Sequence, residues 1–271
     1  MKWVAFSDNP VTRNIPNLPT LPDLAVLDAI PDGQGDVLGE GGGGVTRKVR
    51  YDQNWVAVKT FHGAMTTDGL PQEERRMAAL AGSLGSPCLI QVLGQTKGGA
   101  LVMEFLDGYQ MFGGRPNFET CWKDVYDDTI NRQVTSEEAE TIVTGLLDAL
   151  CQLHHVGICH GDFYGHNILI QETNLAQVRL GDFGGAFFYD TESPYATLIQ
   201  QCELRSFAVF VEEVVDCLQQ GGDKNPETMK ISLRNLVSKS LEADTTFQQT
   251  QSWWKMKKGN EKTGSERQAT R

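Results

Sequence analysis

Two strand-like runs surround a cluster of glycines between Val37 and Phe61, in the sequence GEGGGGVTRKVRYDQNWVAVKTF that begins at Gly39. The runs are rich in valine and aromatic residues, and residues 52–54 carry the Asp and Asn that favour a tight turn. A hairpin alone is barely stable in water, so its apolar face needs further strands or a helix. The segment therefore predicts a hairpin within a larger antiparallel sheet.

The segments that follow extend this sheet and add one helix. Residues 71–84 predict a helix that begins at Pro71, since proline is favoured in a first helical turn. Residues 89–96 and 99–106 predict two more strands, separated by the turn sequence KGG. The first hundred residues are thus expected to form a five-stranded antiparallel sheet with one helix.

Helices dominate the prediction for the second half of the chain. Thr135 followed by Glu138 is a capping-box pattern, and the apolar residues after it share one helical face as far as Leu153. Residues 203–220 and 229–243 predict two further helices. A long buried helix with helical neighbours is therefore expected beside the sheet.

Composition limits the classes of partner. The chain has 271 residues and a formal net charge of −11, so attraction to nucleic acid or anionic lipid would need a local basic patch. No window approaches about 18 apolar residues, and no secretory signal is expected. The six cysteines lack metal-binding spacing, which favours reduced thiols. We expect a cytoplasmic protein with no nucleic-acid partner and no membrane partner.

Glycines and a lysine in the hairpin suggest a site for phosphate. Gly39, Gly41 and Gly44 have the spacing GxGxxG, where missing side chains let backbone amides approach phosphate oxygens. A flexible loop is the alternative interpretation. Because a strand follows, the spacing favours a lid over a nucleotide and not a dinucleotide fold. Lys59 ends the apolar run VAVK and needs an anionic partner, unless it lies at an edge and reaches water.

Glu73 is the expected partner of Lys59. Met77 and Leu80 follow it by four and seven positions, which places the carboxylate of Glu73 on the inward face of the expected helix. Glu74 is the competing candidate, but its spacing to apolar residues is poorer. The sequence thus predicts an ion pair between Lys59 and Glu73.

Three oxygen-bearing side chains follow the long helix. Asp162 and Asn167 lie in CHGDFYGHNILI, and Asp182 begins DFGG after a short strand-like run. Such a set suits a site in which one carboxylate orients a hydroxyl nucleophile, while an amide and a second carboxylate hold Mg²⁺ on a polyphosphate. Either aspartate alone could instead cap a turn. Together with the glycines, Lys59 and Glu73, in this order, they predict a phosphoryl-transfer site.

The order GEGGGG, VAVK, an inward Glu, MEFL, HGDFYGHN and DFG resembles the protein kinase superfamily from about residue 36 to residue 243. The resemblance implies an α+β, two-lobed fold with a small antiparallel sheet and an abbreviated helical lobe. It divides the chain into four parts: a weakly ordered lead-in 1–30, an N-lobe 31–106, a C-lobe 107–243 with an insert at 108–134, and a polar tail 244–271.

The resemblance also implies roles for individual residues, with ATP and Mg²⁺ as cofactors. Asp162 would be the catalytic base, Lys59 would bind the α- and β-phosphates and pair with Glu73, and Asn167 and Asp182 would ligate the metal. His160 would be a structural member of the loop. The nucleotide would be bound by Gly39, Gly41, Gly44, Ala57, Lys59, the gatekeeper Met103, Glu104 and Leu106.

The sequence departs from the family pattern at several points. Gly161 replaces the usual arginine, so regulation through a phosphorylated activation loop is not expected. Tyr164 stands where serine/threonine kinases have a lysine on the transferring phosphoryl group. His166, Arg115 or Arg205 are the candidate substitutes for that lysine. Only about eighteen residues separate Gly184 from the helix at Glu203, which leaves little room for a peptide platform.

The expected function is ATP-dependent transfer of the γ-phosphate to a hydroxyl, with a serine or threonine of a protein as the first choice of acceptor. HGD followed by xxxxN is also similar to aminoglycoside and choline phosphotransferases, so a small-molecule kinase is the first alternative. Gly161 and Tyr164 motivate a second alternative, a pseudokinase scaffold that binds a nucleotide without transfer.

Overall fold

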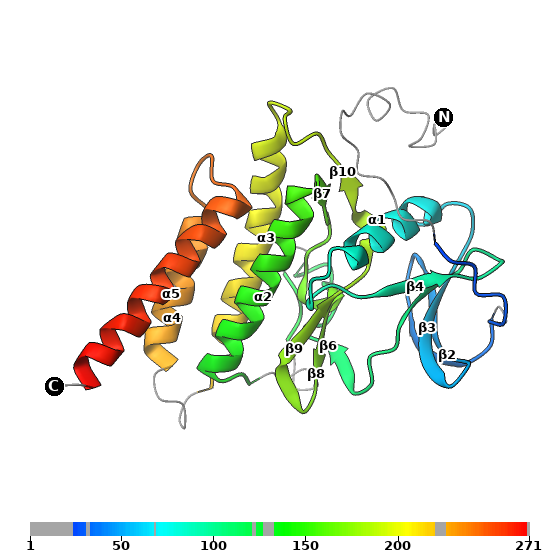
Figure 1. Cartoon of the computed structure of the whole chain (residues 1–271), viewed down its shortest axis with the longest axis horizontal. Coiled ribbons are helices and arrows are strands. Elements are labelled where there is room, and N and C mark those ends of the chain that lie inside the picture. The colour runs from blue at the N-terminus through cyan, green and yellow to red at the C-terminus, as the bar shows by residue number, and fades with distance from the viewer. Residues whose placement is uncertain are drawn as a thin grey trace.

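The computed structural model describes residues 24–30, 33–67, 69–120, 123–126, 133–219 and 226–269, with side chains as far as residue 260. Within these ranges a β-sheet part and a helical part lie side by side (Figure 1). The chain therefore has the expected α+β class. Most of the predicted lead-in, residues 1–23, and parts of the insert, 121–122 and 127–132, lie outside the described residues.

The N-terminal part is the predicted five-stranded antiparallel sheet, in the order β1-β2-β3-β5-β4. Its strands are β1 (Asp36–Glu40), β2 (Gly44–Tyr51), β3 (Asn54–Phe61), β4 (Val92–Gln95) and β5 (Leu101–Glu104). Helix α1 (Pro71–Ser83) packs against it and begins at the predicted proline. In this register Lys59 lies opposite Thr46 on one side and Leu101 on the other, so it occupies the middle of the sheet.

Residues 24–30 belong to this lobe, which corrects the interpretation of residues 1–30 as a lead-in throughout. Backbone hydrogen bonds join Gln95 to Ala25 at 2.9 Å and to Leu27 at 2.8 Å. The Ile30 side chain is buried in a small apolar cluster of the sheet. Local sequence hides this strand-like pairing because its partner Gln95 lies about seventy positions away.

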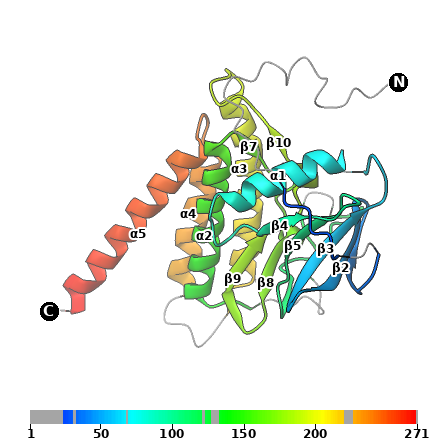
Figure 2. The same cartoon turned by 45° about the vertical axis from the view of Figure 1, so that its right-hand side comes forward.

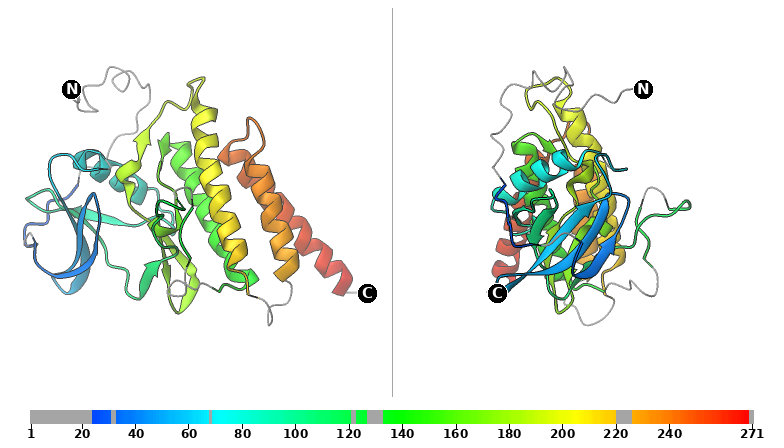
Figure 3. Two further views of the ribbon diagram at one scale, coloured as in Figure 1. Left: turned by 180° about the vertical axis from the view of Figure 1, so that it is seen from behind. Right: turned by 90° about the vertical axis from the view of Figure 1, so that its right-hand side faces the viewer.

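The helical part is built on α2 (Ser136–His155), which has the predicted capping box between Thr135 and Glu138. Helix α3 (Ala196–Asp216) lies beside α2, and α4 (Pro226–Ser240) lies beside α3 (Figure 3). Helix α3 starts seven positions before the predicted 203–220 segment, because its first two turns bury little apolar surface and carry a weak sequence pattern.

Short strands and turns connect the two parts. They are β6 (Tyr109–Met111), β7 (Ile158–Cys159), β8 (Ile168–Gln171), β9 (Asn174–Leu180), β10 (Phe187–Phe188) and the 3₁₀ turns η2 (Gly165–Asn167) and η3 (Phe183–Gly185). Strand β8 lies between β6 and β9, whereas β7 pairs with β10. The loops at the ends of β7 and β9 carry the polar residues singled out in the sequence.

Helix α5 (Phe247–Ala269) replaces the expected polar tail. Phe247 and Trp254 are fully buried in the main core, and the indole N–H of Trp254 donates to Thr144 Oγ1 on α2 at 2.8 Å. Figure 2 shows the second half of α5 extending beyond the other helices. The interpretation of this segment as a solvated tail was wrong for its first half, because two aromatic residues are enough to fix a polar helix.

Candidate active site

Lys59 joins the sheet to the helical part. Its buried ammonium lies 2.6 Å from Glu74 Oε1 and 2.9 Å from Asp182 Oδ1. Burial disfavours the charged form, but Asp182 and Glu74 outweigh that effect and raise the pKa of Lys59 above its ordinary value. The ammonium is therefore a fixed positive charge, and it is not the edge lysine of the alternative interpretation.

The partner of Lys59 is Glu74, and the prediction of Glu73 was wrong. Glu74 is 5% exposed, whereas the Glu73 carboxylate accepts a hydrogen bond from Arg76 at 3.3 Å on the outer side of α1. Adjacent residues on a helix point about 100° apart, so only one of the two can face the sheet. The spacing to apolar residues favoured Glu73, but the observed packing of α1 turns Glu74 inward.

Asp182 follows β9 in a conformation that is rare for a residue with a side chain. Its φ is +53°, in the left-handed region. Burial opposes its ionisation, but the charge and hydrogen bond of Lys59 outweigh this and lower the pKa of Asp182. Its side chain is still 41% exposed. The structure thus presents an ionised carboxylate that solvent can reach.

Asp162 and Asn167 contact each other directly. The Asn167 amide donates to Asp162 Oδ2 at 2.8 Å and to the Asp162 carbonyl at 2.9 Å. The N–H of Gly181 donates to the Asn167 carbonyl at 3.0 Å, which ties this loop to the residue before Asp182. A Cβ built on Gly185 would lie 3.2 Å from Asp162 Cβ. The structure therefore brings Asp162, Asn167 and Asp182 together.

His160 has the structural position expected for it. It is fully buried, and its Nε2 lies 2.9 Å from the carbonyl oxygen of Gly181. Gly161 beside it has a φ of +76°, and a Cβ there would lie 2.3 Å from the carbonyl oxygen of Gly185. An arginine cannot take this place without moving the backbone of η3, which explains why glycine replaces it.

Glu203 on α3 holds the backbone of the same loop, and sequence reasoning missed it. Its carboxylate accepts hydrogen bonds from the N–H groups of His160 at 3.1 Å and Gly161 at 2.7 Å, and lies 2.6 Å from His154 Nε2. Burial opposes its ionisation, but the contact with His154 outweighs it and lowers the pKa of Glu203. A glutamate inside an apolar helical run was the signal that could have revealed it.

The insert contacts the loop 160–167 through a second buried carboxylate, that of Asp124. Asp124 accepts from the His166 N–H at 2.6 Å, and its other oxygen lies 2.8 Å from His166 Nδ1. Glu213 on α3 accepts from the Asp124 N–H at 3.1 Å and from the Tyr126 hydroxyl at 2.9 Å. Burial, with the Asp124 charge, raises the pKa of Glu213 to about 7. These contacts are long-range, and no sequence pattern indicated them.

The three glycines of the GxGxxG spacing lie at the tight turn that joins β1 to β2: Gly39 is in β1, Gly41 is in the turn and Gly44 begins β2. Gly41 and Gly44 exchange backbone hydrogen bonds of 3.0 and 3.3 Å. A Cβ on Gly44 would lie 2.3 Å from the carbonyl oxygen of Thr60, whereas a Cβ on Gly39 would meet nothing within 4 Å. Position 44 therefore has no room for a side chain, which explains its glycine, whereas packing does not require glycine at position 39.

The residues expected around adenine lie on β3, on β5 and just after β5. Ala57 and Met103 are buried and face each other across the two strands. The Glu104 side chain accepts from the Gln91 N–H at 2.9 Å and from Arg179 at 3.3 Å, and Leu106 packs against the main core. Their contacts with a nucleotide stay predictions.

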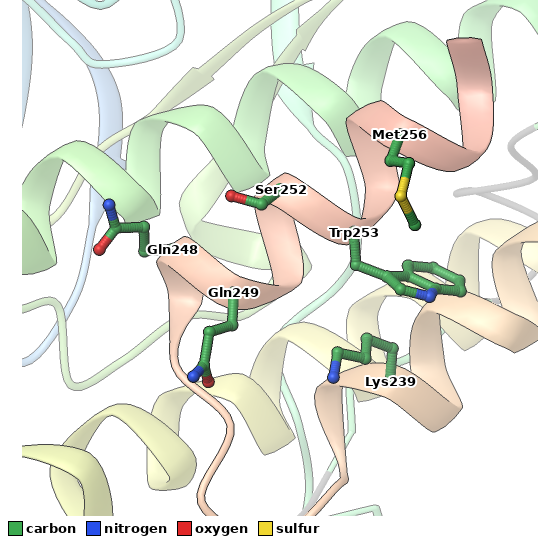
Figure 4. Close-up of a pocket in the computed structure, with 6 residues that line it drawn as sticks. All are labelled: Lys239, Gln248, Gln249, Ser252, Trp253 and Met256. Atoms are coloured by element: carbon green, nitrogen blue, oxygen red, sulfur yellow. The ribbon is translucent and has the colours of Figure 1, made fainter. Parts of the chain in front are cut away.

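A separate surface hollow of about 410 Å³ lies on the other side of the helical part, where α4 meets α5 (Figure 4). Its walls are formed by Lys239, Gln248, Gln249, Ser252, Trp253 and Met256. This set contains no carboxylate that could act as a base or bind a metal ion. The hollow is therefore not a second candidate for phosphoryl transfer.

The family model of the protein kinase domain matches residues 33–206, more than half of the chain. The match includes the glycine turn, Lys59, Glu74, Asp162, Asn167 and Asp182. The chain belongs to the protein kinase domain family. It is accordingly a protein-kinase-like phosphotransferase that uses ATP. Among the described residues, no helix is long and apolar enough to cross a membrane.

Proposed function

We propose that the protein transfers the γ-phosphate of ATP to the hydroxyl of a protein serine or threonine. The observation that carries this proposal is the ammonium of Lys59, which contacts Glu74 and Asp182 at once. A cation held between two parts of the fold in this way is positioned for the α- and β-phosphates. A scaffold that only binds a partner has no chemical need for it.

Asp162 is the proposed base. Its Oδ2 is held by Asn167, while its Oδ1 has no hydrogen-bond partner among the described residues. It can therefore accept the proton of an acceptor hydroxyl as that oxygen attacks the phosphorus. An aliphatic hydroxyl needs such help more than a phenol, whose pKa is about 10. This reasoning favours serine or threonine over tyrosine as the acceptor.

Asn167 and Asp182 are the proposed ligands of Mg²⁺. Carboxylate and amide oxygens suit this hard cation, and Asp182 is ionised and reachable from solvent. No group of three or more acidic, His or Cys side chains in the described part of the chain could hold a metal ion. This donor set fits an ion that also binds substrate phosphates. When bound, the ion would neutralise phosphate charge.

A small-molecule hydroxyl is the second candidate acceptor. Only residues 186–195 separate η3 from α3, and two of them, Phe187 and Phe188, pair with β7. Little chain is left to form a platform for an extended peptide. This observation favours a compact acceptor, whereas VAVK and the full DFG favour a protein substrate.

The test uses labelled ATP and Mg²⁺ with a mixed protein acceptor and, separately, a pool of small metabolites. We expect label on serine or threonine, and a loss of about 100-fold or more in Asp162→Asn with little change in ATP binding. Asp148→Asn on α2, whose carboxylate contacts Gln251 and Lys255, is the control and should stay active. Label only on small molecules would favour the second candidate. ATP binding without any transfer would favour a pseudokinase.

A further inference from the structure

The guanidinium of Arg115 lies against the backbone of the glycine turn. A Cβ built on Gly41 would be 2.8 Å from Nη2 and 3.1 Å from Nη1 of Arg115. Gly41 belongs to the turn between β1 and β2, whereas Arg115 lies in the insert 108–134, a few residues after β6. The insert therefore reaches across to the tip of the turn, and Arg115 occupies the space that a side chain at position 41 would need.

The backbone before Arg115 is held firmly. Phe112 is fully buried, and its N–H donates to the Ile168 carbonyl at 2.7 Å. Gly114 and Val125 exchange two backbone hydrogen bonds of 2.9 Å each. Arg115 follows Gly114 directly, so its starting point is fixed relative to the loop that carries Asn167. An arginine anchored in this way is more than a loose surface residue.

The charge of Arg115 has no partner among the described residues. The side chain is exposed, and it makes no hydrogen bond or ion pair within the described ranges. Guanidinium has five donors in a planar fork that suits phosphate oxygens. The amides of Gly42 and Gly43 in the same turn also lack an acceptor within the described ranges. Several donors at one turn are thus available to an outside anion.

His62 is the other cationic candidate at the turn, but it is already engaged. Its Nε2 lies 3.1 Å from the carbonyl oxygen of Gly41 and 4.0 Å from the Glu40 carboxylate. Tyr164, where the family has a lysine, carries no positive charge and stacks on His166 with ring centroids 5.6 Å apart. Arg115 is therefore the guanidinium best placed to meet phosphate from the side of the insert.

We infer that Arg115 binds the terminal phosphates of ATP and supplies the positive charge that Tyr164 lacks. This inference rests on the proposed function of the site. A bidentate contact to phosphate would also fix the glycine turn over the nucleotide, because the same side chain touches Gly41. Arg115 would then be a phosphate-binding residue contributed by the insert.

Binding of ATP, ADP and AMP to the full chain tests the inference by calorimetry, with Mg²⁺ and with a chelator. Arg115→Ala should weaken the affinity for ATP by about 10- to 100-fold and change the affinity for AMP by about twofold at most, because Arg115 is inferred to contact only the terminal phosphates. The ATP affinity of Arg115→Lys should lie between those of the unaltered chain and Arg115→Ala, since lysine keeps the positive charge but lacks the planar guanidinium. Arg234→Ala on α4, which removes an exposed arginine paired with Glu212 at 3.9 Å, is the control.

The possible results distinguish a failure of the role of Arg115 from a failure of the proposed function. Unchanged ATP affinity in Arg115→Ala, or an equal loss for ATP and AMP, would overturn the role of Arg115 while leaving the proposed function intact. The same loss seen in Arg205→Ala but not in Arg115→Ala would give the role to the other arginine. If the unaltered chain binds no nucleotide at all, the proposed function and this inference both fail. Melting temperatures close to that of the unaltered chain would show that the variants fold.

Discussion

The ammonium of Lys59 and the carboxylate of Glu74 lie 2.6 Å apart in a buried position, while the neighbouring Glu73 faces Arg76. The contact crosses from the sheet to α1, and Lys59 also reaches Asp182. Its geometry thus depends on three parts of the fold at once. A change at Glu74 should be felt in the position of the Lys59 ammonium, whereas a change at Glu73 should not.

Glu74→Gln is expected to slow phosphoryl transfer by about tenfold or more, which corresponds to about 1.4 kcal/mol of transition-state stabilisation. The glutamine keeps the size of the side chain but removes the charge that holds Lys59. Glu73→Gln is the matched control and should change the rate by less than about twofold, because the Glu73 carboxylate pairs with the exposed Arg76 and not with Lys59. Steady-state rates of both variants check this, and equal effects would contradict the assignment of Glu74.

The fold could be predicted where local pattern and long-range packing agree. The five strands, α1 and the capping box of α2 follow from alternation, turn residues and helix signals. The helix α5 could not be predicted, because its place depends on two buried aromatic residues and on Thr144 in another helix. The pairing of residues 24–30 with the sheet was not predicted for the same reason, since their partner Gln95 is distant in the chain.

The site could be predicted as a set of residue types but not as a set of contacts. Lys59 contacts Asp182, and Asn167 contacts Asp162, while the roles that the resemblance implied for these residues stay predictions. The choice between Glu73 and Glu74 depends on how α1 is rotated about its axis against the sheet. The spacing of apolar residues does not fix this rotation well enough to distinguish two adjacent positions. Three buried carboxylates, Asp124, Glu203 and Glu213, support the loop from segments far away. The apolar run around Glu203 could have indicated a buried charge there, but sequence spacing does not predict which residues these carboxylates contact.

Glu213 should make stability depend on pH. Its pKa is raised from 4.5 to about 7, so the folded state binds more protons than the unfolded state between these values. Stability should therefore fall as pH rises from about 4.5 to 7 and stay lower above that range. Glu213→Gln should remove this loss, so that the variant gains about 3 kcal/mol relative to the unaltered chain between pH 4.5 and pH 8.

Urea unfolding at pH 4.5, 6 and 8 measures this effect for the unaltered chain, Glu213→Gln and Glu212→Gln. The last variant is the control, since the Glu212 side chain is 44% exposed and lies 3.9 Å from the exposed Arg234. An identical pH dependence in all three proteins would show that Glu213 is not the titrating group.

Two glycines of the turn should respond differently to alanine. Gly44→Ala places a methyl group 2.3 Å from the carbonyl oxygen of Thr60, a rigid backbone atom, so β2 and β3 must separate. We expect a loss of about 1–3 kcal/mol of stability. Gly39→Ala meets nothing within 4 Å and should leave the melting temperature unchanged. Thermal unfolding of both variants checks this, and equal melting temperatures would contradict the steric explanation.

Glu203→Gln should destabilise the protein by about 2–4 kcal/mol. The glutamine side chain puts an N–H₂ group where an oxygen accepts from His160 or Gly161, so one buried backbone donor loses its acceptor. Its contact with His154 loses its charge as well. Denaturant unfolding measures the loss, and a change below about 0.5 kcal/mol would show that the loop does not depend on this carboxylate.

Phe247, the first residue of α5, stacks on His154 with ring centroids 4.4 Å apart, and His154 in turn contacts Glu203. The match to the protein kinase domain ends at residue 206, inside α3. It therefore excludes Phe247, whose ring stacks on His154. The residues that match the family thus pack against an aromatic residue that lies outside the match. A truncation after residue 206 would remove Phe247 and expose His154 on the side where the two rings stack. It would therefore disturb phosphoryl transfer, although it leaves Lys59, Asp162 and Asp182 in the chain.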